Sequence, residues 1–374
     1  MRIQNAKIYR DGGWSSGDLY MNQGIFCSED SGGESIDAQG RMAVPGFIDI
    51  HTHGAFGNDV NDAQEDQYRR IAHFFASQGT TAWNASILTD TPERTGHALD
   101  VVRELSGKQI GGAELLGAHL EGPFLSAKYK GAMPETLLRA GDADLFREYQ
   151  KRSGDCVRYL TVAPEREGVE ALIAEISDEV TVAIGHSAAT YAQAQEAIRN
   201  GARCATHTFN AMRPLEHHEP GILGAVLESD IYCEMICDGR HLAPATVRLL
   251  IKTKGWDRVI AVTDSIMAAG LPDGTYHLGI NEVFVHGADA TLADGTRAGS
   301  TLTSIQAFRN LMEFTGESPE TVLPAFTINP ARALRIDDHK GKIEIGYDAD
   351  LVLLDERYQI VMTIVGGEIV YRRS

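Results

Sequence analysis

The sequence has few of the features that mark secreted, membrane-spanning or nucleic-acid-binding proteins. Its apolar runs are much shorter than the about 20 residues that a membrane-spanning helix needs, and its first residues lack the apolar core of a secretion signal. The 374 residues include five cysteines, an odd number without disulfide-like spacing. Lys and Arg number 34 against 52 Asp and Glu, and the net charge of −18 argues against nucleic acid and anionic membranes as partners. We therefore expect a cytoplasmic protein that acts on a small molecule.

The chain does contain a recurring unit, made of an apolar strand, polar residues and a helical stretch. At 43% apolar and 23% charged residues, the composition is that of a globular protein with a sizeable core. Residues 65–79 and 188–201 carry apolar side chains at helical spacing. The eight strand candidates are 46–53, 80–88, 114–122, 156–165, 181–187, 204–209, 232–239 and 258–265. Eight is the number that a barrel of this kind requires, so the predicted fold is α/β, with a (β/α)8 TIM-type barrel.

The two ends of the chain differ from this middle part. Both contain alternating apolar segments separated by turn dipeptides. Each end is too short to form a stable sheet alone, so we expect residues 1–44 and 338–374 to pair in one small β-sandwich domain. Residues 45–337 would then form the catalytic barrel, with β-hairpins inserted at about 273–299, where Asp-Gly turns occur.

The first barrel strand ends in two histidines. The stretch from Val44 to Asp59 reads VPGFIDIHTHGAFGND, and places His51 and His53 on either side of one threonine. Residues two apart in an extended strand lie on one face. The two imidazoles therefore converge, which suits a divalent metal better than a packing interface.

Polar residues also follow the other strands, at the end where barrel enzymes build their sites. Neutral histidine and carboxylate are good ligands for zinc and other first-row divalent ions. An isolated histidine is more often a hydrogen-bonded structural residue, but several in register indicate a metal centre. The candidate ligands are His51, His53, Glu121, His186 and His207, and the same strand ends also carry Asp238 and Asp264. His119 is expected to pack or to support a ligand, and Cys233 and Cys237 are expected to be core residues.

Asp264 ends the eighth apolar strand with an acid. A structural aspartate could cap a helix there. A hydrolytic metal site needs a base beside the attacking water and an acid for the leaving group, and one carboxylate can serve as both in turn. Asp264 is therefore the candidate catalytic residue.

These motifs resemble a known family. The segments PGFIDIHTHG, HLEGPF, GHS, THTFNAM, EPG, DGRHL, TDS and AGSTLT, with the tail NPAR and GKIEIGYDADLVLLD, are similar to the amidohydrolase superfamily and, within it, to the N-acetylglucosamine-6-phosphate deacetylase family. The likeness covers essentially the whole chain. It implies metal-dependent hydrolysis of the N-acetyl group of N-acetyl-D-glucosamine 6-phosphate, giving D-glucosamine 6-phosphate and acetate. It also implies a homodimer.

The resemblance further implies residue roles. Glu121, His186 and His207 would hold the main divalent cation, expected to be zinc, with iron, manganese or cobalt as alternatives. Because His51 and His53 are both present, a second cation bridged by Glu121 is expected, giving one or two per subunit. Asp264 would take a proton from water and give it to the departing amine. The substrate would be bound by His241, by Asn210 and Ala211 near its phosphate, and by residues at positions 133 and 218.

Two positions depart from the family pattern. His218 stands immediately before EPG, where the family usually has an arginine supplied across a dimer interface to the phosphate. Histidine lacks the permanent bidentate fork of arginine. Met133 stands where many members have a histidine or glutamine that contacts the acyl oxygen, and methionine cannot donate a hydrogen bond. These departures leave open a different acyl group or sugar.

Three other functions stay open from the sequence. An unphosphorylated or epimeric N-acetylhexosamine would fit the change at His218. A cyclic-amide hydrolase of the same superfamily often carries a carboxylated lysine after the fourth strand, but this chain has VAPE there. A non-catalytic sugar-binding barrel would be favoured by a missing ligand or base, and none of the main ones is missing.

Overall fold

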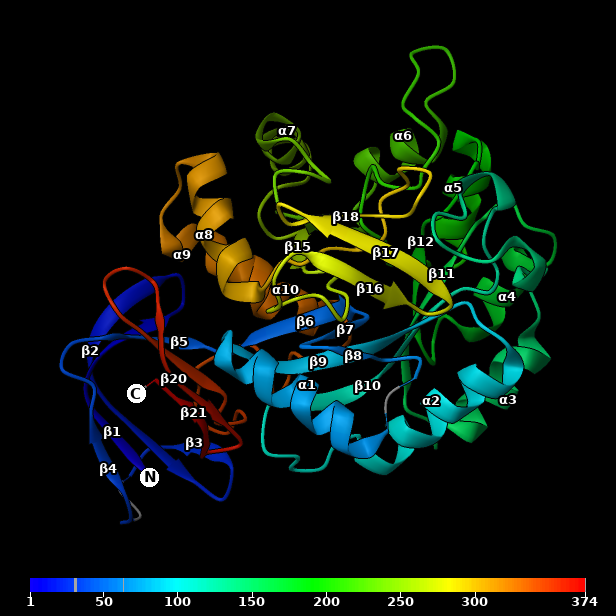
Figure 1. The fold of residues 1–374 in the computed structure, drawn as a ribbon. Helices are drawn as coiled ribbons and strands as arrows, with labels where there is room; N and C mark the ends of the chain where they lie inside the picture. The colour runs from blue at the N-terminus through cyan, green and yellow to red at the C-terminus, as the bar shows by residue number, and fades with distance from the viewer. Residues whose placement is uncertain (30–31, 63, 374) are drawn as a thin grey trace.

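Eight parallel strands form the centre of the molecule. The computed structural model describes residues 1–29, 32–62 and 64–373 (Figure 1). The strands pair in the order β15-β14-β13-β12-β11-β10-β9-β6, which is chain order and confirms the predicted eight-stranded barrel. Their bounds are β6 (Phe47–Thr52), β9 (Thr80–Leu88), β10 (Glu114–Glu121), β11 (Val157–Val162), β12 (Thr181–Ile184), β13 (Cys204–Ala205), β14 (Tyr232–Ile236) and β15 (Val259–Val262).

The barrel closes where its first and eighth strands meet. The backbone N–H of Asp264 donates to the carbonyl of His51 at 2.9 Å, and the N–H of His53 donates to the carbonyl of Ser265 at 2.7 Å. The buried carboxylate of Asp49 accepts a hydrogen bond from the Thr263 hydroxyl at 2.6 Å. We call this contact between residues 49–53 and 263–265 the seam. It brings the histidine pair and Asp264 together at the carboxyl end of the strands.

Helices cover the outside of the barrel (Figure 1). The first begins at Glu65, as the sequence pattern predicts, and buries Tyr68, Ile71 and Phe75. Thr190 caps the helix predicted after the fifth strand by accepting a hydrogen bond from the Gln193 N–H. The helices are α1 (Glu65–Ser77), α2 (Pro92–Leu105), α3 (Ala143–Arg152), α4 (Val169–Ile176), α5 (Tyr191–Arg199), α6 (Gly221–Glu228), α7 (Pro244–Lys254), α8 (Ser304–Thr315), α9 (Pro319–Val322) and α10 (Ile328–Ala333), with 3₁₀ turns η1 (Ala127–Tyr129), η2 (Glu135–Leu137) and η3 (Leu323–Phe326). Among the described residues, no helix has the length and apolar character to span a bilayer.

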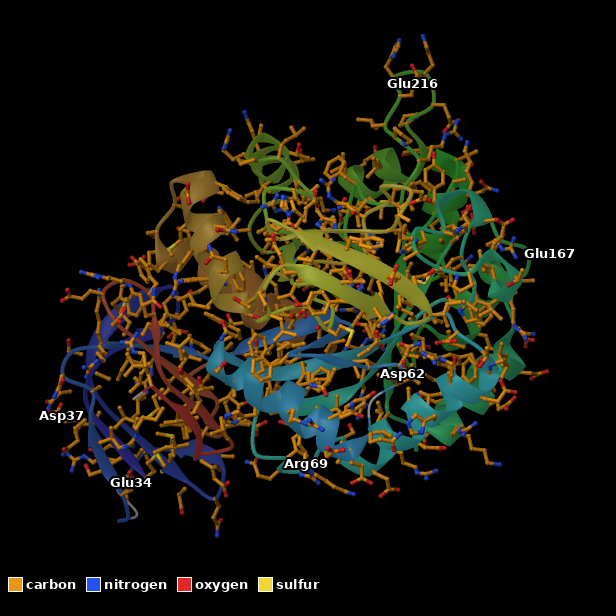
Figure 2. All side chains as sticks on the ribbon, in the orientation of Figure 1. Glu34, Asp37, Asp62, Arg69, Glu167 and Glu216 are labelled. Carbon is orange, nitrogen blue, oxygen red and sulfur yellow. The ribbon has the colours of Figure 1, made fainter. Side chains whose placement is uncertain are left out.

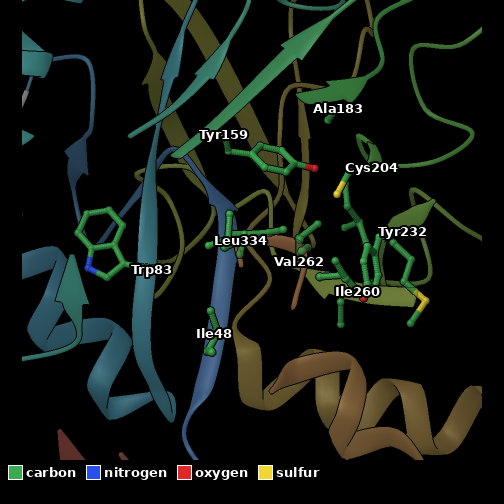
Figure 3. Close-up of a cluster of buried hydrophobic side chains, with 14 of the residues drawn as sticks. Ile48, Trp83, Tyr159, Ala183, Cys204, Tyr232, Ile260, Val262 and Leu334 are labelled. Carbon is green, nitrogen blue, oxygen red and sulfur yellow. The ribbon is translucent and has the colours of Figure 1, made fainter. Parts of the chain in front are cut away.

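The barrel strands are buried on both faces. Figure 3 shows Ile48, Trp83, Tyr159, Cys204 and Ile260 in one continuous apolar cluster. Strands covered by helices outside and by one another inside are expected to be apolar throughout. All five cysteines are free, and Cys233 and Cys237 are buried, as expected for core residues.

The two ends of the chain form a second sheet, which lies beside the barrel and carries both termini (Figure 1). Its strand order is β21-β20-β19-β5-β1-β2-β3, with β4 paired to β1. The sheet has its own apolar cluster, which includes Ile3, Leu19, Phe26 and Ile364. The strands are β1 (Arg2–Arg10), β2 (Gly13–Asn22), β3 (Ile25–Cys27), β4 (Ser35–Asp37), β5 (Met42–Pro45), β19 (Leu351–Leu354), β20 (Ile360–Val365) and β21 (Glu368–Arg372).

A buried lysine joins this sheet to the barrel. The side chain of Lys340 is 3% exposed, and its ammonium lies 2.7 Å from Glu114, 2.7 Å from Asp348 and 2.9 Å from Asp350. Glu114 opens barrel strand β10, while Asp348 and Asp350 precede β19. The three carboxylates, which alone would resemble a cation site, already share this ammonium.

The insertion after the eighth strand is a three-stranded antiparallel sheet. It is fixed to the barrel by two hydrogen bonds, from the Gly279 N–H to Asp59 at 2.9 Å and from the Asn281 amide to the Ala132 carbonyl at 2.8 Å. These contacts place the insertion beside the loop that follows β10. Its strands are β16 (Gly274–Leu278), β17 (Asn281–His286) and β18 (Asp289–Thr291), and a further two-stranded pair is formed by β7 (Gly54–Ala55) and β8 (Asn58–Asp59).

Candidate metal centre and active site

The two histidines at the end of β6 lie side by side and are buried. Their Nε2 atoms are 3.3 Å apart. The Oδ1 atom of Asp264, which follows β15, lies 3.1 Å from the Nε2 of His53 and 3.6 Å from that of His51. One ligand atom from each of these three residues lies within 4.8 Å of the other two. The seam thus creates the first of two groups of donor atoms.

Glu121 connects this group to a second one. Its Oε2 lies 3.3 Å from the Nε2 of His53, while its Oε1 lies 3.1 Å from His186 Nε2 and 3.3 Å from His207 Nε2. The Nε2 atoms of His186 and His207 are 3.0 Å apart. Its Oε1 also lies 3.4 Å from the Nε2 of His51, so the carboxylate of Glu121, at the end of β10, lies between the two groups.

The protonation pattern of the histidines fits a bound cation. The Nδ1 atoms of His51, His53 and His186 lie 2.9, 2.9 and 2.8 Å from oxygen acceptors on Glu234, Ser86 and Tyr129. A ring that donates from Nδ1 in its neutral form has a bare lone pair on Nε2. The Nε2 atoms of His51 and His53, 3.3 Å apart, would then both be bare and would repel each other unless a proton or a metal cation lies between them. Imidazole nitrogen and carboxylate oxygen are also the donors that first-row divalent ions prefer.

The electrostatics of the centre point the same way. Burial opposes a charge on His51, but Glu234, Glu121 and Asp264 outweigh it and raise its pKa well above the ordinary value. Burial likewise opposes ionisation of Glu121, yet the neighbouring histidines, His51 foremost, hold its pKa well below the usual range. The cluster is therefore built to stabilise positive charge in a buried place.

His119 differs from these ligands. Burial and then the charge of His51 lower its pKa well below the ordinary value, so it is neutral. Its two ring nitrogens each lie 2.8 Å from a hydroxyl, on Ser86 and Thr161. Its ring meets that of His51 edge-on at 4.6 Å. His119 thus has the supporting role that we expected, and its ring lies on the same side of β10 as Glu121, as the two-residue spacing requires.

A cavity of about 600 Å³ opens over the centre. Eleven residues were predicted from the sequence to be catalytic, metal-binding or substrate-binding. Nine of them line the cavity, namely His53, Glu121, Met133, His186, His207, Asn210, Ala211, His241 and Asp264. His51 is fully buried below it. His218 is exposed and does not line the cavity of its own chain. It belongs to the loop that projects beside α6, where Glu216 is labelled in Figure 2.

Comparison with known proteins decides the family. The sequence matches the Amidohydrolase family over residues 42–370. It is 38% identical over 335 residues, 88% of this chain and 85% of the relative, to N-acetylglucosamine-6-phosphate deacetylase of Bacillus subtilis (strain 168), and 36% identical over 398 residues, 100% and 96%, to that of Homo sapiens. The chain belongs to the N-acetylglucosamine-6-phosphate deacetylase family of amidohydrolases. Members of this family are hydrolases that act on an amide bond.

Solved structures of family members have the same fold throughout. The structure from Thermotoga maritima superimposes with a TM-score of 0.90 at 35% identity, covering 100% of both chains. A mutant of the Mycobacterium smegmatis family member, solved in complex with N-acetyl-D-glucosamine-6-phosphate, superimposes with a TM-score of 0.91 at 32% identity, covering 99% of both. The amidohydrolase centre described above is thus embedded in the complete architecture of its family.

Several residues around the site of this chain were not identified from the sequence. Glu234, inside the apolar strand β14, accepts the hydrogen bond from His51, and Ser86 accepts that from His53. Lys130 and Arg297 bring positive charge to the cavity wall from the loop after β10 and from the insertion. A charged residue in a strand buried on both faces is the one signal that would have identified Glu234.

Proposed function

We propose that the protein hydrolyses the N-acetyl group of N-acetyl-D-glucosamine 6-phosphate, releasing acetate and D-glucosamine 6-phosphate, in the cytoplasm. The observation that carries this proposal is the pair of donor groups sharing Glu121, with Asp264 beside them, at the floor of a cavity of about 600 Å³. Small-molecule sites usually have volumes of about 300–1,000 Å³. The substrate is inferred from the relatives, which are N-acetylglucosamine-6-phosphate deacetylases.

Two divalent cations per subunit are proposed, with zinc as the first expectation and iron, manganese or cobalt as alternatives. Glu121, His186 and His207 would hold one, and His51, His53 and Asp264 would surround the other, with Glu121 between them. A bound cation of this kind supplies Lewis acidity, because it polarises a carbonyl oxygen and makes water a stronger acid.

Asp264 is the proposed proton carrier. Its carboxylate takes a proton from the water that attacks the amide carbonyl carbon, and then gives this proton to the amide nitrogen as the C–N bond breaks. The water oxygen ends in acetate and the nitrogen in a free amine, so one water is consumed for each acetyl group. The Nε2 atom of His53 lies 3.1 Å from this carboxylate, so a cation held by His53 would lie beside the proton carrier.

The proposed sugar contacts lie around the rim. Asp238 accepts a hydrogen bond from Nδ1 of His241 at 2.7 Å, which leaves Nε2 of this ring for the sugar. Asn210 and Ala211 are proposed to bind the phosphate, with Lys130 and Arg297 adding positive charge to the same cavity. Met133 packs among apolar side chains and is proposed to contact the acyl group.

His218 is proposed to act between subunits. Because it is exposed and remote from its own cavity, it can reach a substrate only in a second copy of the chain. This position supports a homodimer in which the projecting loop of one subunit closes the site of the other. Sedimentation of the purified protein at micromolar concentration tests the assembly, and a monomer would overturn it.

An unphosphorylated or epimeric N-acetylhexosamine is the second candidate substrate. It is favoured by histidine at position 218, because that side chain carries no permanent positive charge at neutral pH. A phosphate would then rely on Lys130 and Arg297 of the same chain.

The deciding experiment compares kcat/KM for acetate release from N-acetyl-D-glucosamine 6-phosphate, from its 2-epimer and from the free sugar. We expect the first substrate to be preferred over the free sugar by at least about 100-fold, since one charge-assisted anion site contributes about 3 kcal/mol. The variant Lys130→Met should reduce this preference without abolishing turnover, and Lys342→Met, which is remote from the cavity, should leave it unchanged. A strong preference for the free sugar would overturn the phosphorylated substrate.

A further inference from the structure

Glu234 is a fully buried carboxylate that touches both groups of proposed cation ligands. It lies on β14 and is 0% exposed. Its Oε2 lies 2.9 Å from Nδ1 of His51 and accepts a hydrogen bond from the backbone N–H of His207 at 2.8 Å. Its Oε1 accepts a hydrogen bond from the hydroxyl of Tyr159 at 2.7 Å. One side chain thus contacts a residue from each group of donors.

The charge of Glu234 needs an explanation. A buried carboxylate costs several kcal/mol unless hydrogen bonds and opposite charge compensate it. The donors that it meets are an imidazole, a phenol and a peptide N–H, and none of these is a permanent cation. Positive charge can therefore compensate Glu234 only through His51, either as a second proton on this ring or as a cation at its Nε2, which faces Glu121 and Asp264.

The backbone at the second contact is unusual. His207 has φ +27°, and the proposed ligand His186 has φ +45°, both in the left-handed region that non-glycine residues rarely adopt. Such a conformation persists only where surrounding contacts determine it. The hydrogen bond from the His207 N–H to Glu234 is one of these contacts, so the carboxylate also fixes the position from which His207 presents its ring.

We propose that Glu234 is a positioning residue that supports one cation site of this chain, that of His51 and His53, more strongly than the other. It holds His51 in the form that is protonated on Nδ1, raises the basicity of its Nε2, and fixes the backbone of His207. The charge acts mainly on the site of His51 and His53, because the carboxylate bonds directly to the imidazole there. At the site of Glu121, His186 and His207 it acts only through a peptide N–H.

The variant Glu234→Gln separates charge from shape. Glutamine keeps the volume, and its amide oxygen can still accept from His51 and His207. Its NH₂ group can donate to Tyr159, whose hydroxyl also accepts. The variant therefore removes the negative charge while preserving the three contacts. Tyr159→Phe is the matched control, since it removes one contact and preserves the charge.

The test is a titration of metal-free protein with Co²⁺, followed by the visible absorption of the bound ion and by competition with a chelator of known affinity. We expect wild type to take up two equivalents. In Glu234→Gln the second equivalent should bind about 10–100-fold more weakly, the usual effect of losing a ligand-supporting group, and the first should stay within about threefold. Tyr159→Phe should stay close to wild type for both.

Several results would overturn the proposal. They are unchanged affinity of the second equivalent in Glu234→Gln, equal weakening of both equivalents, and a larger effect in Tyr159→Phe than in Glu234→Gln. Should Glu234→Gln fail to fold, as judged by circular dichroism of the metal-free protein, Glu234→Asp takes its place. It keeps the charge but withdraws it from His51 by one methylene, so the second equivalent must weaken, and unchanged binding would refute the proposal.

The inference rests on the ligand assignment of the proposed function, and a further variant distinguishes the two failures. His53→Asn should reduce uptake from two equivalents to one. If it does not, the ligand assignment is wrong. If it does and Glu234→Gln still binds like wild type, only the role of Glu234 is wrong.

Discussion

Replacing Asp264 by asparagine removes the proposed proton carrier with little change of shape. The backbone N–H of residue 264 still donates to the carbonyl of His51, so the seam is preserved. An asparagine side chain cannot accept a proton from water and return it to a leaving nitrogen. The change therefore removes the proton carrier and one donor to the cation proposed beside His51 and His53, and it leaves the backbone of the seam in place.

The expected magnitude follows from the role. A positioned acid or base contributes about 10²–10⁴-fold to the rate, and Asp264 is proposed to serve as both, so kcat should fall by at least about 100-fold. That corresponds to about 3 kcal/mol or more of transition-state stabilisation. The cation at Glu121, His186 and His207 should remain, because Asp264 does not belong to that group of donors.

The assay is acetate release under saturating N-acetyl-D-glucosamine 6-phosphate, together with the metal content of the same samples. Asp238→Asn is the matched control, since this carboxylate sits at the end of the neighbouring strand and bonds to His241. It should raise KM by about tenfold, the loss expected from one charge-assisted hydrogen bond, with kcat nearly unchanged. Turnover of Asp264→Asn within about tenfold of wild type, with metal retained, would refute the proton-carrier role.

Three further outcomes are expected. Lys340→Met should lower the free energy of unfolding in urea by about 3–5 kcal/mol, because it leaves the buried carboxylate of Asp350, and the partly exposed ones of Glu114 and Asp348, without their ammonium. Lys342→Met, from an exposed pair, should cost less than about 1 kcal/mol, and equal losses would contradict the assignment. Met133→Ala should leave kcat/KM for the N-acetyl substrate within about fourfold, which corresponds to about one methylene of buried contact with the acyl group. The same variant should improve the relative rate on an N-propionyl analogue. An unchanged ratio of the two rates would remove Met133 from the acyl pocket. Chelation of wild type should abolish turnover and added Zn²⁺ or Co²⁺ should restore it; full activity after verified metal removal would reject a metal-dependent reaction.

The barrel was accessible from the sequence because its signals are local. Each strand is a short apolar run, and residues such as Glu121 and His186 follow directly after such runs. Parallel strands joined by helices bring their carboxyl ends to one side, so a chain-wide pattern of strand ends predicts a common site without coordinates. The seven polar residues that follow the predicted strands thus include most of the residues of the centre.

Other parts depend on contacts between distant segments and carry no local signal. The pairing of Glu234 with His51 joins residues 183 positions apart, and the strand around Glu234 reads only as an apolar core segment. Lys130 and Arg297 look like ordinary surface cations in sequence, and only the folded insertion brings them to one cavity. The exposed position of His218 likewise follows from the path of its loop rather than from its neighbours in the chain.

The seam also has a mechanical consequence. His51 and His53 stand on one side of it and Asp264 on the other, so any ion bonded to all three spans the line along which the cylinder is joined. Under the proposed ligand assignment, removal of that ion should therefore make the folded protein unfold faster, by separation of the first and eighth strands, as well as abolishing turnover.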